Sequence, residues 1–288
     1  MGIKFRLIVM NFLQYAIWGS WLISLGAYLG GGLDFTGLQI GSFFATMGVA
    51  SLFMPAVMGI IADRWIPAQK LLGICHLVSG GFLIAAASQT AYGPLYSCML
   101  LSVMFYMPTI ALSNSVAYNA LDLARLDTVK HFPPIRVWGT VGFIAAMWFV
   151  DLTHIGGVQI KLTEWQLYVS AVLSFLLSVY SFSLPGCPVD RNVKARSWVD
   201  TLGLRAFTLF KEKRMAIFFV FSMLLGAALQ ITNAFGDSYI QSFGSMPQYA
   251  DSAIVKHSVI LLSLSQMSET LCILLIPFFL RRFGIKKV

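Results

Sequence analysis

The stretch LLGICHLVSGGFLIAAASQTA, residues 71–91, determines the fold class that this sequence can adopt. Its 21 residues include no Asp, Glu, Lys or Arg. A helix of about 20 apolar residues crosses the roughly 30 Å hydrocarbon layer of a membrane. The strands of a membrane β-barrel instead alternate in polarity over about ten residues. We therefore predict that residues 71–91 form a membrane-spanning helix.

Comparable windows recur along the 288 residues, of which 58% are hydrophobic and only 11% are charged. Mean hydropathy is +0.77, and a soluble domain usually has about a quarter of its residues charged. Eight spans are predicted, at residues 7–29, 38–62, 71–91, 94–118, 133–152, 166–184, 215–236 and 257–280. The chain is thus expected to be an all-α, multi-pass membrane protein.

The basic residues are distributed unevenly between the two sides of these spans. Of the 20 Lys and Arg residues, 17 lie before the first span, after the eighth, or in alternate connections between them. The opposite connections contain only Lys161 and Lys256. Because cytoplasmic loops are enriched in Lys and Arg, both termini and the segment 185–214 are expected in the cytoplasm. The net charge of +8 therefore reflects topology, and no nucleic-acid partner is predicted.

The segment 185–214 is the longest polar stretch, and it separates six predicted spans from two. This pattern indicates three parts. They are an N-terminal six-helix bundle at residues 1–184, a cytoplasmic linker at 185–214, and the first two helices of an incomplete C-terminal bundle at 215–288.

Two short cytoplasmic turns occupy equivalent places in these halves. GIIADRWIPAQK, residues 59–70, follows the second span, and PFFLRRFGIKK, residues 277–287, follows the eighth. Both resemble the G-x-x-x-D-R-x-G-x-K/R signature of the major facilitator superfamily, and the first copy keeps Gly59, Asp63 and Arg64. The resemblance implies a transporter fold of twelve helices. We therefore expect a truncated chain with eight of those twelve.

The sequence gives no sign of a catalytic or metal centre. Its four cysteines are scattered singly, without a CxxC or Cys/His ligand spacing, so neither a disulfide nor a bound metal is expected. A paired nucleophile and base is also lacking. We predict no cofactor and no enzymatic activity.

Polar side chains inside the spans form stripes along single helical faces, because residues three, four or seven apart lie on one side of a helix. The stripes consist of Arg136, Thr140 and Phe143; Gln230 and Asn233; and Gln266 and Glu269. Carboxamides provide donors and an acceptor that suit a neutral ligand such as a nucleobase edge. The alternative is that they only hydrogen-bond between helices.

Glu269 and Arg136 are the ionisable members of these stripes. Glu269 is expected near the middle of its span, where an acid that faces a wet cavity can serve a proton-coupled transporter. It could instead pair permanently with a base such as Arg136. Arg136 could in turn extend to the cytoplasmic interface, or face the cavity beside Thr140, with the Phe143 ring available for stacking.

Two further stripes are compatible with plain packing. Asn11, Gln14 and Trp18 share one face of the first span, and Asn114 and Tyr118 share one of the fourth. Their aromatic members fit helix packing or the aromatic belt of a membrane as well as they fit a binding site.

Longer strings are similar to the nucleoside:proton symporters of the major facilitator superfamily, the family of bacterial nucleoside and xanthosine permeases. The strings are NFLQYAIWGSWLISLGAY (11–28), FPPIRVWGTVGFI (132–144), KRMAIFFVFSMLLGAALQITNAFG (213–236) and SLSQMSETLCILLIPFFL (263–280). The resemblance implies nucleoside uptake with protons across a bacterial inner membrane, by a monomer. It also implies that the seven striped residues line the site. In such proteins a tenth helix adds aromatic groups and a second carboxylate, and this chain is expected to end before that helix.

Two other functions remain open from the residues alone. One is a sugar/proton symporter of the same superfamily, and the other is a truncated membrane protein that does not transport. In that second case the intramembrane polar residues would only hold helices together.

Overall fold

The computed structural model describes residues 2–189 and 209–284, which are helical apart from short turns and one small hairpin. The first bundle contains α1 (Ile3–Gly19), α2 (Leu25–Ala27), the π-helical turn η1 (Tyr28–Gly32), α3 (Gly37–Arg64), α4 (Ala68–Ala87), α5 (Tyr92–Leu123), α6 (Thr128–Leu152) and α7 (Trp165–Ser181). Between α6 and α7 lie β1 (His154–Ile155), β2 (Val158–Gln159) and the 3-10 turn η2 (Ile160–Leu162). The second part contains α9 (Lys213–Ser242), η4 (Phe243–Ser245), α10 (Ala253–Lys256) and α11 (Ser258–Phe283).

The prediction of an all-helical, multi-pass membrane protein is confirmed. Each of the eight predicted spans overlaps one of the long helices. Within the described residues, α3, α4, α5, α6 and α9 are long and apolar enough to cross a membrane, and α7 is a shorter apolar helix.

The first helix differs from its prediction, because it is broken. A continuous helix was expected over 7–29, whereas α1 ends at Gly19 and a turn precedes α2. In this turn the hydrogen bonding tightens, since the Trp21 N–H reaches the Trp18 carbonyl at 3.3 Å. The Ser20 hydroxyl donates to the Ala16 carbonyl at 2.7 Å, a bond that competes with the regular helix ladder.

Helices α1 and α6 approach each other closely, and glycine makes this possible. A Cβ at Gly142 would overlap the Phe12 carbonyl, and one at Gly19 would overlap the Phe143 carbonyl. Small residues at a membrane-helix interface allow backbones to come together. The contact fixes the position of α6, the helix that carries Arg136.

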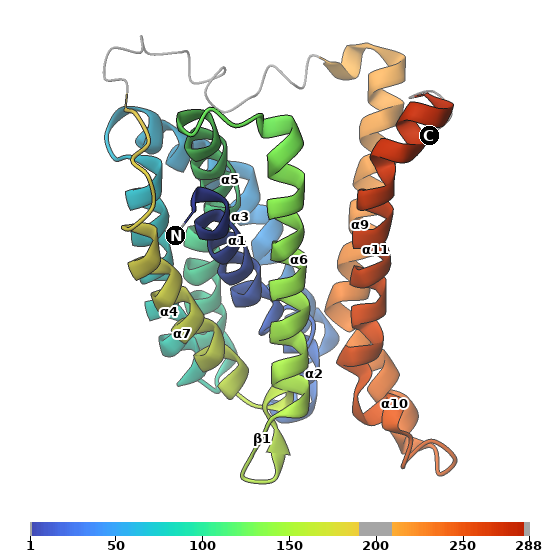
Figure 1. Cartoon of the computed structure of the whole chain (residues 1–288). Helices are drawn as coiled ribbons and strands as arrows, with labels where there is room; N and C mark the ends of the chain where they lie inside the picture. Colours follow the sequence, from blue (N-terminus) through green and yellow to red (C-terminus); the bar gives the residue numbers. More distant parts are fainter. Residues whose placement is uncertain (1, 190–208, 285–288) are drawn as a thin grey trace.

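The α9 and α11 pair stands beside the first bundle (Figure 1). The two parts meet at the end where the β1 hairpin and α10 lie, through α2 against α9 and α6 against α11. Toward the end where α7 stops and α9 starts, the ribbons of α6 and α9 diverge (Figure 1). A Cβ at Gly26 would overlap the Ala234 carbonyl, so the backbones of α2 and α9 touch.

The predicted linker, 185–214, lies for the most part outside the described residues. Its first residues pack on the six-helix bundle, where the Cys187 N–H donates to Gln69 Oε1 at 2.9 Å. Asn119 Nδ2 also donates to the Gly186 carbonyl, at 3.2 Å.

Candidate functional site

Arg136 is held in the first turns of α6, against α1. The helix begins at Thr128, earlier than the expected residue 133, because the Asp127 side chain caps it by accepting the Val129 and Lys130 N–H groups. The Arg136 guanidinium carbon lies 3.8 Å from the centroid of the Tyr15 ring. Such cation–π contacts fix the direction of an arginine.

Arg136, Thr140 and Glu269 line one cavity of about 480 Å³ between α6 and α11. Arg136 and Thr140 come from the first bundle and Glu269 from the second part, so the two parts contribute to one space. Among the described residues, no ion pair joins Arg136 to Glu269. Arg136 contacts Tyr15 instead, and the Glu269 side chain is exposed.

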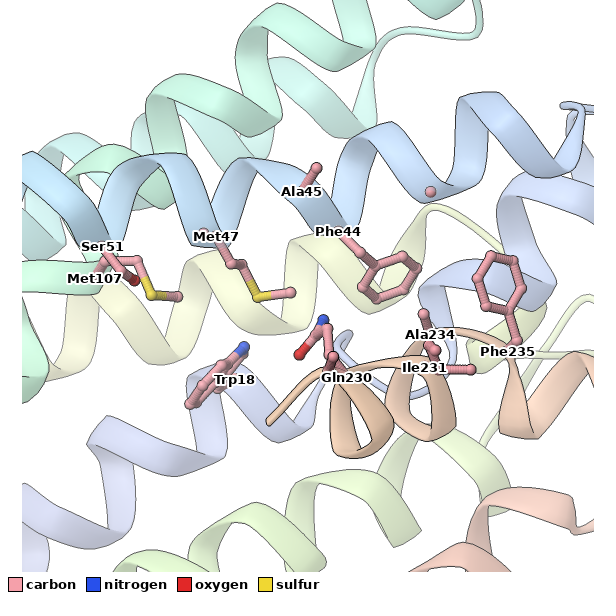
Figure 2. Close-up of a pocket in the computed structure, with 13 residues that line it drawn as sticks. Trp18, Phe44, Ala45, Met47, Ser51, Met107, Gln230, Ile231, Ala234 and Phe235 are labelled. Carbon is pink, nitrogen blue, oxygen red and sulfur yellow. The ribbon is translucent and has the colours of Figure 1, made fainter. Parts of the chain in front are cut away.

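Gln230 lines a second cavity of about 560 Å³, between α1, α3 and α9 (Figure 2). Trp18, Phe44, Met47 and Met107 form apolar walls there. The Gln230 Nε2 atom is buried and has no hydrogen-bond partner within the described part of the chain.

Phe143 lines neither of these two cavities. It is buried, and its ring meets the Trp18 ring edge-on, with 6.5 Å between the centroids. Asn233 and Gln266 are half-buried, one turn from Gln230 and Glu269 respectively, and they line neither of the two cavities. Of the seven predicted residues, three therefore line one cavity, Gln230 lines another, and Phe143, Asn233 and Gln266 line neither.

The signature residues Gly59, Asp63 and Arg64 form the last turns of α3. Asp63 is exposed there, and none of the ion pairs found among the described residues involves it. These residues lie at the helix end and line neither cavity.

Behind the cavities, a buried polar network fixes the helices of the first bundle. Gln14 Nε2 donates to Thr109 Oγ1 at 2.7 Å, and Gln14 Oε1 lies 2.8 Å from His76 Nε2. The other His76 nitrogen lies 3.2 Å from Ser174 Oγ. The Tyr106 hydroxyl donates to the Gln14 carbonyl at 2.7 Å. This satisfied network is structural, because each of its polar groups already has a partner.

A second polar cluster, which we call the outer cluster, joins the two parts at their closed end. Its members are Asp151, Lys161, Asp237, His257 and Ser258. The Lys161 ammonium is 2.6 Å from Asp151 Oδ1 and donates to Ser258 Oγ at 3.2 Å. Ser258 donates to Asp237, and His257 Nδ1 lies 2.8 Å from Asp151 Oδ2.

Most of this cluster is buried, and it spans the interface. Lys161 is 1% exposed, and Asp151 and Asp237 are 0% exposed. Lys161 also donates to the Lys256 carbonyl at 2.9 Å. A buried charge is tolerated only when it is paired and hydrogen-bonded, so these contacts favour the state in which the two parts are together at this end.

The sequence predictions missed the outer cluster. The distribution of basic residues predicts only that Lys161 lies, with Lys256, in the connections opposite the basic ones. The available signal was an acid, Asp151, near the outer end of its span, but no local spacing connects it to Asp237 on another helix. Trp18 belongs to a predicted stripe that is compatible with packing. Its cavity could not be predicted from that stripe, because α9 forms part of the wall.

Comparison with known proteins gives a consistent result. The family model described as nucleoside H+ symporter matches residues 1–288. Xanthosine permease of Escherichia coli (strain K12) is 52% identical over 288 residues, which cover 100% of this chain and 68% of that protein. Nucleoside permease NupG of the same organism is 48% identical, with the same coverage. A crystal structure of a mutant of the nucleoside transporter NupG superposes with a TM-score of 0.90 at 48% identity, covering 99% of this chain and 70% of that one.

Proposed function

Because the chain belongs to the nucleoside H+ symporter family, it takes up nucleosides together with protons, and we propose that it does so by alternating access around a site between its two helical parts. It is a multi-pass inner-membrane transporter with a helical fold of the major facilitator type. Family membership favours this function over the sugar symporter and the non-transporting protein.

The observation that carries the proposal is the cavity shared by Arg136, Thr140 and Glu269. Substrate sites of such transporters lie near the middle of the membrane, between the repeats that move. A cavity with walls from both α6 and α11 changes shape whenever the two parts move relative to each other. Binding there is therefore coupled to the transport movement.

Each of the seven predicted residues has a proposed role that follows from its chemistry. The Arg136 guanidinium and the Thr140 hydroxyl provide hydrogen bonds to a polar ligand. The amides of Gln230, Asn233 and Gln266 bind ribose hydroxyls and base edges. The Phe143 ring offers a stacking surface.

Glu269 is the proposed proton carrier. A carboxyl is the group in this cavity that gains and loses a proton without a metal or cofactor. Its exposure in the cavity and its freedom from an ion pair with Arg136 support the role, because a permanently paired carboxylate could not exchange protons with the medium. Protonation would neutralise the Glu269 carboxylate before the site is closed to both sides of the membrane, where an unpaired charge is costly.

In the proposed alternating-access cycle, the contacts of the outer cluster close one end of the interface between the two parts. With both termini in the cytoplasm, as the distribution of basic residues supports, the closed end faces outward and the diverging ends of α6 and α9 face inward. This arrangement corresponds to an inward-facing state. In the outward-facing state the contacts of Lys161 with Lys256 and Ser258 must separate, while its pair with Asp151 remains within the first bundle.

The proposed organisation keeps the three parts predicted from the sequence: a six-helix bundle at 1–184, a cytoplasmic linker at 185–214, and the first helices of a second bundle at 215–288. Four more helices would complete the twelve that this fold implies. We propose a monomer, because the cavity between α6 and α11 is formed within one chain.

Replacement of Glu269 by Gln tests the proposal, because the amide keeps the size of the carboxyl but cannot carry a proton. Cells that express the E269Q variant should exchange labelled uridine but fail to accumulate it against a gradient. Uptake by the unchanged protein should be abolished by a protonophore and competed by excess nucleoside but not by hexose. Glu212, exposed at the start of α9, is the matched control, and E212Q should accumulate uridine normally. Accumulation by E269Q at the level of the unchanged protein would refute the role of Glu269.

A further inference from the structure

The Trp18 side chain lines the second cavity and carries an unused hydrogen-bond donor. Its indole Nε1 atom is buried and has no partner among the described residues, like Nε2 of Gln230. Trp18 extends from α1 and Gln230 from α9, and both line the same space (Figure 2). A buried donor without a partner costs free energy, so such groups usually indicate a missing ligand or water.

The Trp18 ring is held in a fixed position. It packs against Tyr106, with ring centroids 5.8 Å apart, and edge-on against Phe143 at 6.5 Å. The Tyr106 hydroxyl is itself anchored on the Gln14 carbonyl at 2.7 Å. These contacts hold the indole at the wall of the cavity, and the same packing connects it to the predicted site residue Phe143.

The walls of this cavity indicate what it binds. Phe44, Met47 and Met107 provide apolar surface around the two N–H donors, and the volume of about 560 Å³ falls within the roughly 300–1,000 Å³ of small-molecule sites. These walls suit a flat ring with hydrogen-bond acceptors on its edge. Methionine side chains adapt their shape to different partners, so rings of different size can be accommodated.

We propose that Trp18 is a substrate-binding residue, whose indole N–H donates, together with Gln230, to an acceptor on the edge of the nucleobase. The inference rests on the proposed function, since it takes Gln230 to be part of the nucleoside site. It adds to the seven residues a donor from α1. The base would then lie against Phe143 and Trp18, between the two helical parts.

Replacement of Trp18 by Phe keeps an aromatic ring and removes the donor. For W18F we expect the KM for uridine to rise about fivefold, the typical effect of one lost hydrogen bond, with the maximal rate within about twofold of its original value. The control is W138F, because Trp138 is exposed on α6 and lines neither cavity. It should leave the KM unchanged.

A competitor without acceptors distinguishes binding from a merely structural role. Ribosylbenzene, in which a phenyl ring replaces the base, should inhibit uridine uptake equally well in W18F and in the unchanged protein. Equal weakening of uridine and ribosylbenzene would mean that Trp18 only shapes the cavity, and would overturn the inference.

A second variant covers the case in which W18F does not fold. Incorporation of benzothienylalanine at position 18 replaces the indole N–H with sulfur and keeps the shape of the side chain. It should raise the KM for uridine as W18F does. A KM within twofold of the original would refute the role of Trp18 and leave nucleoside transport itself intact, whereas absence of uridine uptake by the unchanged protein would refute the proposed function.

Discussion

Replacement of Lys161 by Met should open the outer end of the protein. Lys161 donates across the interface to the Lys256 carbonyl and to Ser258 Oγ, at 2.9 and 3.2 Å. Hydrogen bonds from a charged donor contribute about 1.5–3 kcal/mol each. Loss of both should disfavour the closed state by about 3 kcal/mol, taking the lower value. Since each 1.4 kcal/mol is about tenfold, the ratio of closed to open molecules should fall by about two orders of magnitude.

The distance between the two outer ends measures this shift. Spin labels can be attached at Ile155 in the hairpin and at Tyr249 before α10, because both side chains are exposed and lie outside the outer cluster. Double electron–electron resonance on the unchanged protein should give mainly the short distance. K161M should move most of the distribution to a longer distance.

Two controls separate opening from general damage. K161M leaves Asp151 buried without its cation, which destabilises the fold itself by several kcal/mol. The double variant K161M/D151N removes both charges, and should regain thermal stability while still favouring the longer distance. Lys256 pairs with Asp251 on the surface, where their side chains are 55% and 101% exposed, so K256M should change nothing. A short-distance distribution in K161M/D151N would refute the closing role of the outer cluster.

Two further predictions concern packing and topology. G142A should lower the melting temperature, because its methyl group would overlap the Phe12 carbonyl and overpacking costs about 1–3 kcal/mol. The control is G81A on α4, whose methyl group meets open space and which should be neutral or slightly stabilising. Equal melting temperatures of G142A and G81A would contradict the close contact of α1 and α6. In a variant with Cys187 as its sole cysteine, a membrane-permeant maleimide should label intact cells and an impermeant one should not, because this residue follows α7 at the end that we propose to be cytoplasmic. Burial raises the pKa of the Cys187 thiol, so less thiolate is present at neutral pH. Labelling should therefore be slow and should accelerate as the pH rises. Rapid labelling by the impermeant reagent would contradict the proposed orientation.

The helices could be predicted from the sequence because the membrane imposes their length and polarity. A stretch such as 71–91 has no other stable structure in a bilayer. The break after Gly19 could not be predicted in this way, because hydropathy does not register the bond from the Ser20 hydroxyl to the Ala16 carbonyl. The backbones of α2 and α9 touch at Gly26 and Ala234, and no local pattern in either segment records that contact.

The site was predictable to the extent that its residues repeat on one helical face. Spacing grouped Arg136 with Thr140, and the structure adds that Glu269 of α11 shares their cavity. The partner of Arg136, the Tyr15 ring, lies on another helix and was not anticipated. Lys161 and Asp237 likewise come together only through the packing of two bundles, so single-helix periodicity could not reveal them.

A structure determined with bound uridine tests the central claim most directly. We predict that the nucleoside lies between α6 and the α9–α11 pair, within hydrogen-bonding distance of about 3 Å from Arg136 and Gln230, with Glu269 at its edge. Uridine bound away from all three of these side chains, or within one helical bundle alone, would contradict a site formed by both parts.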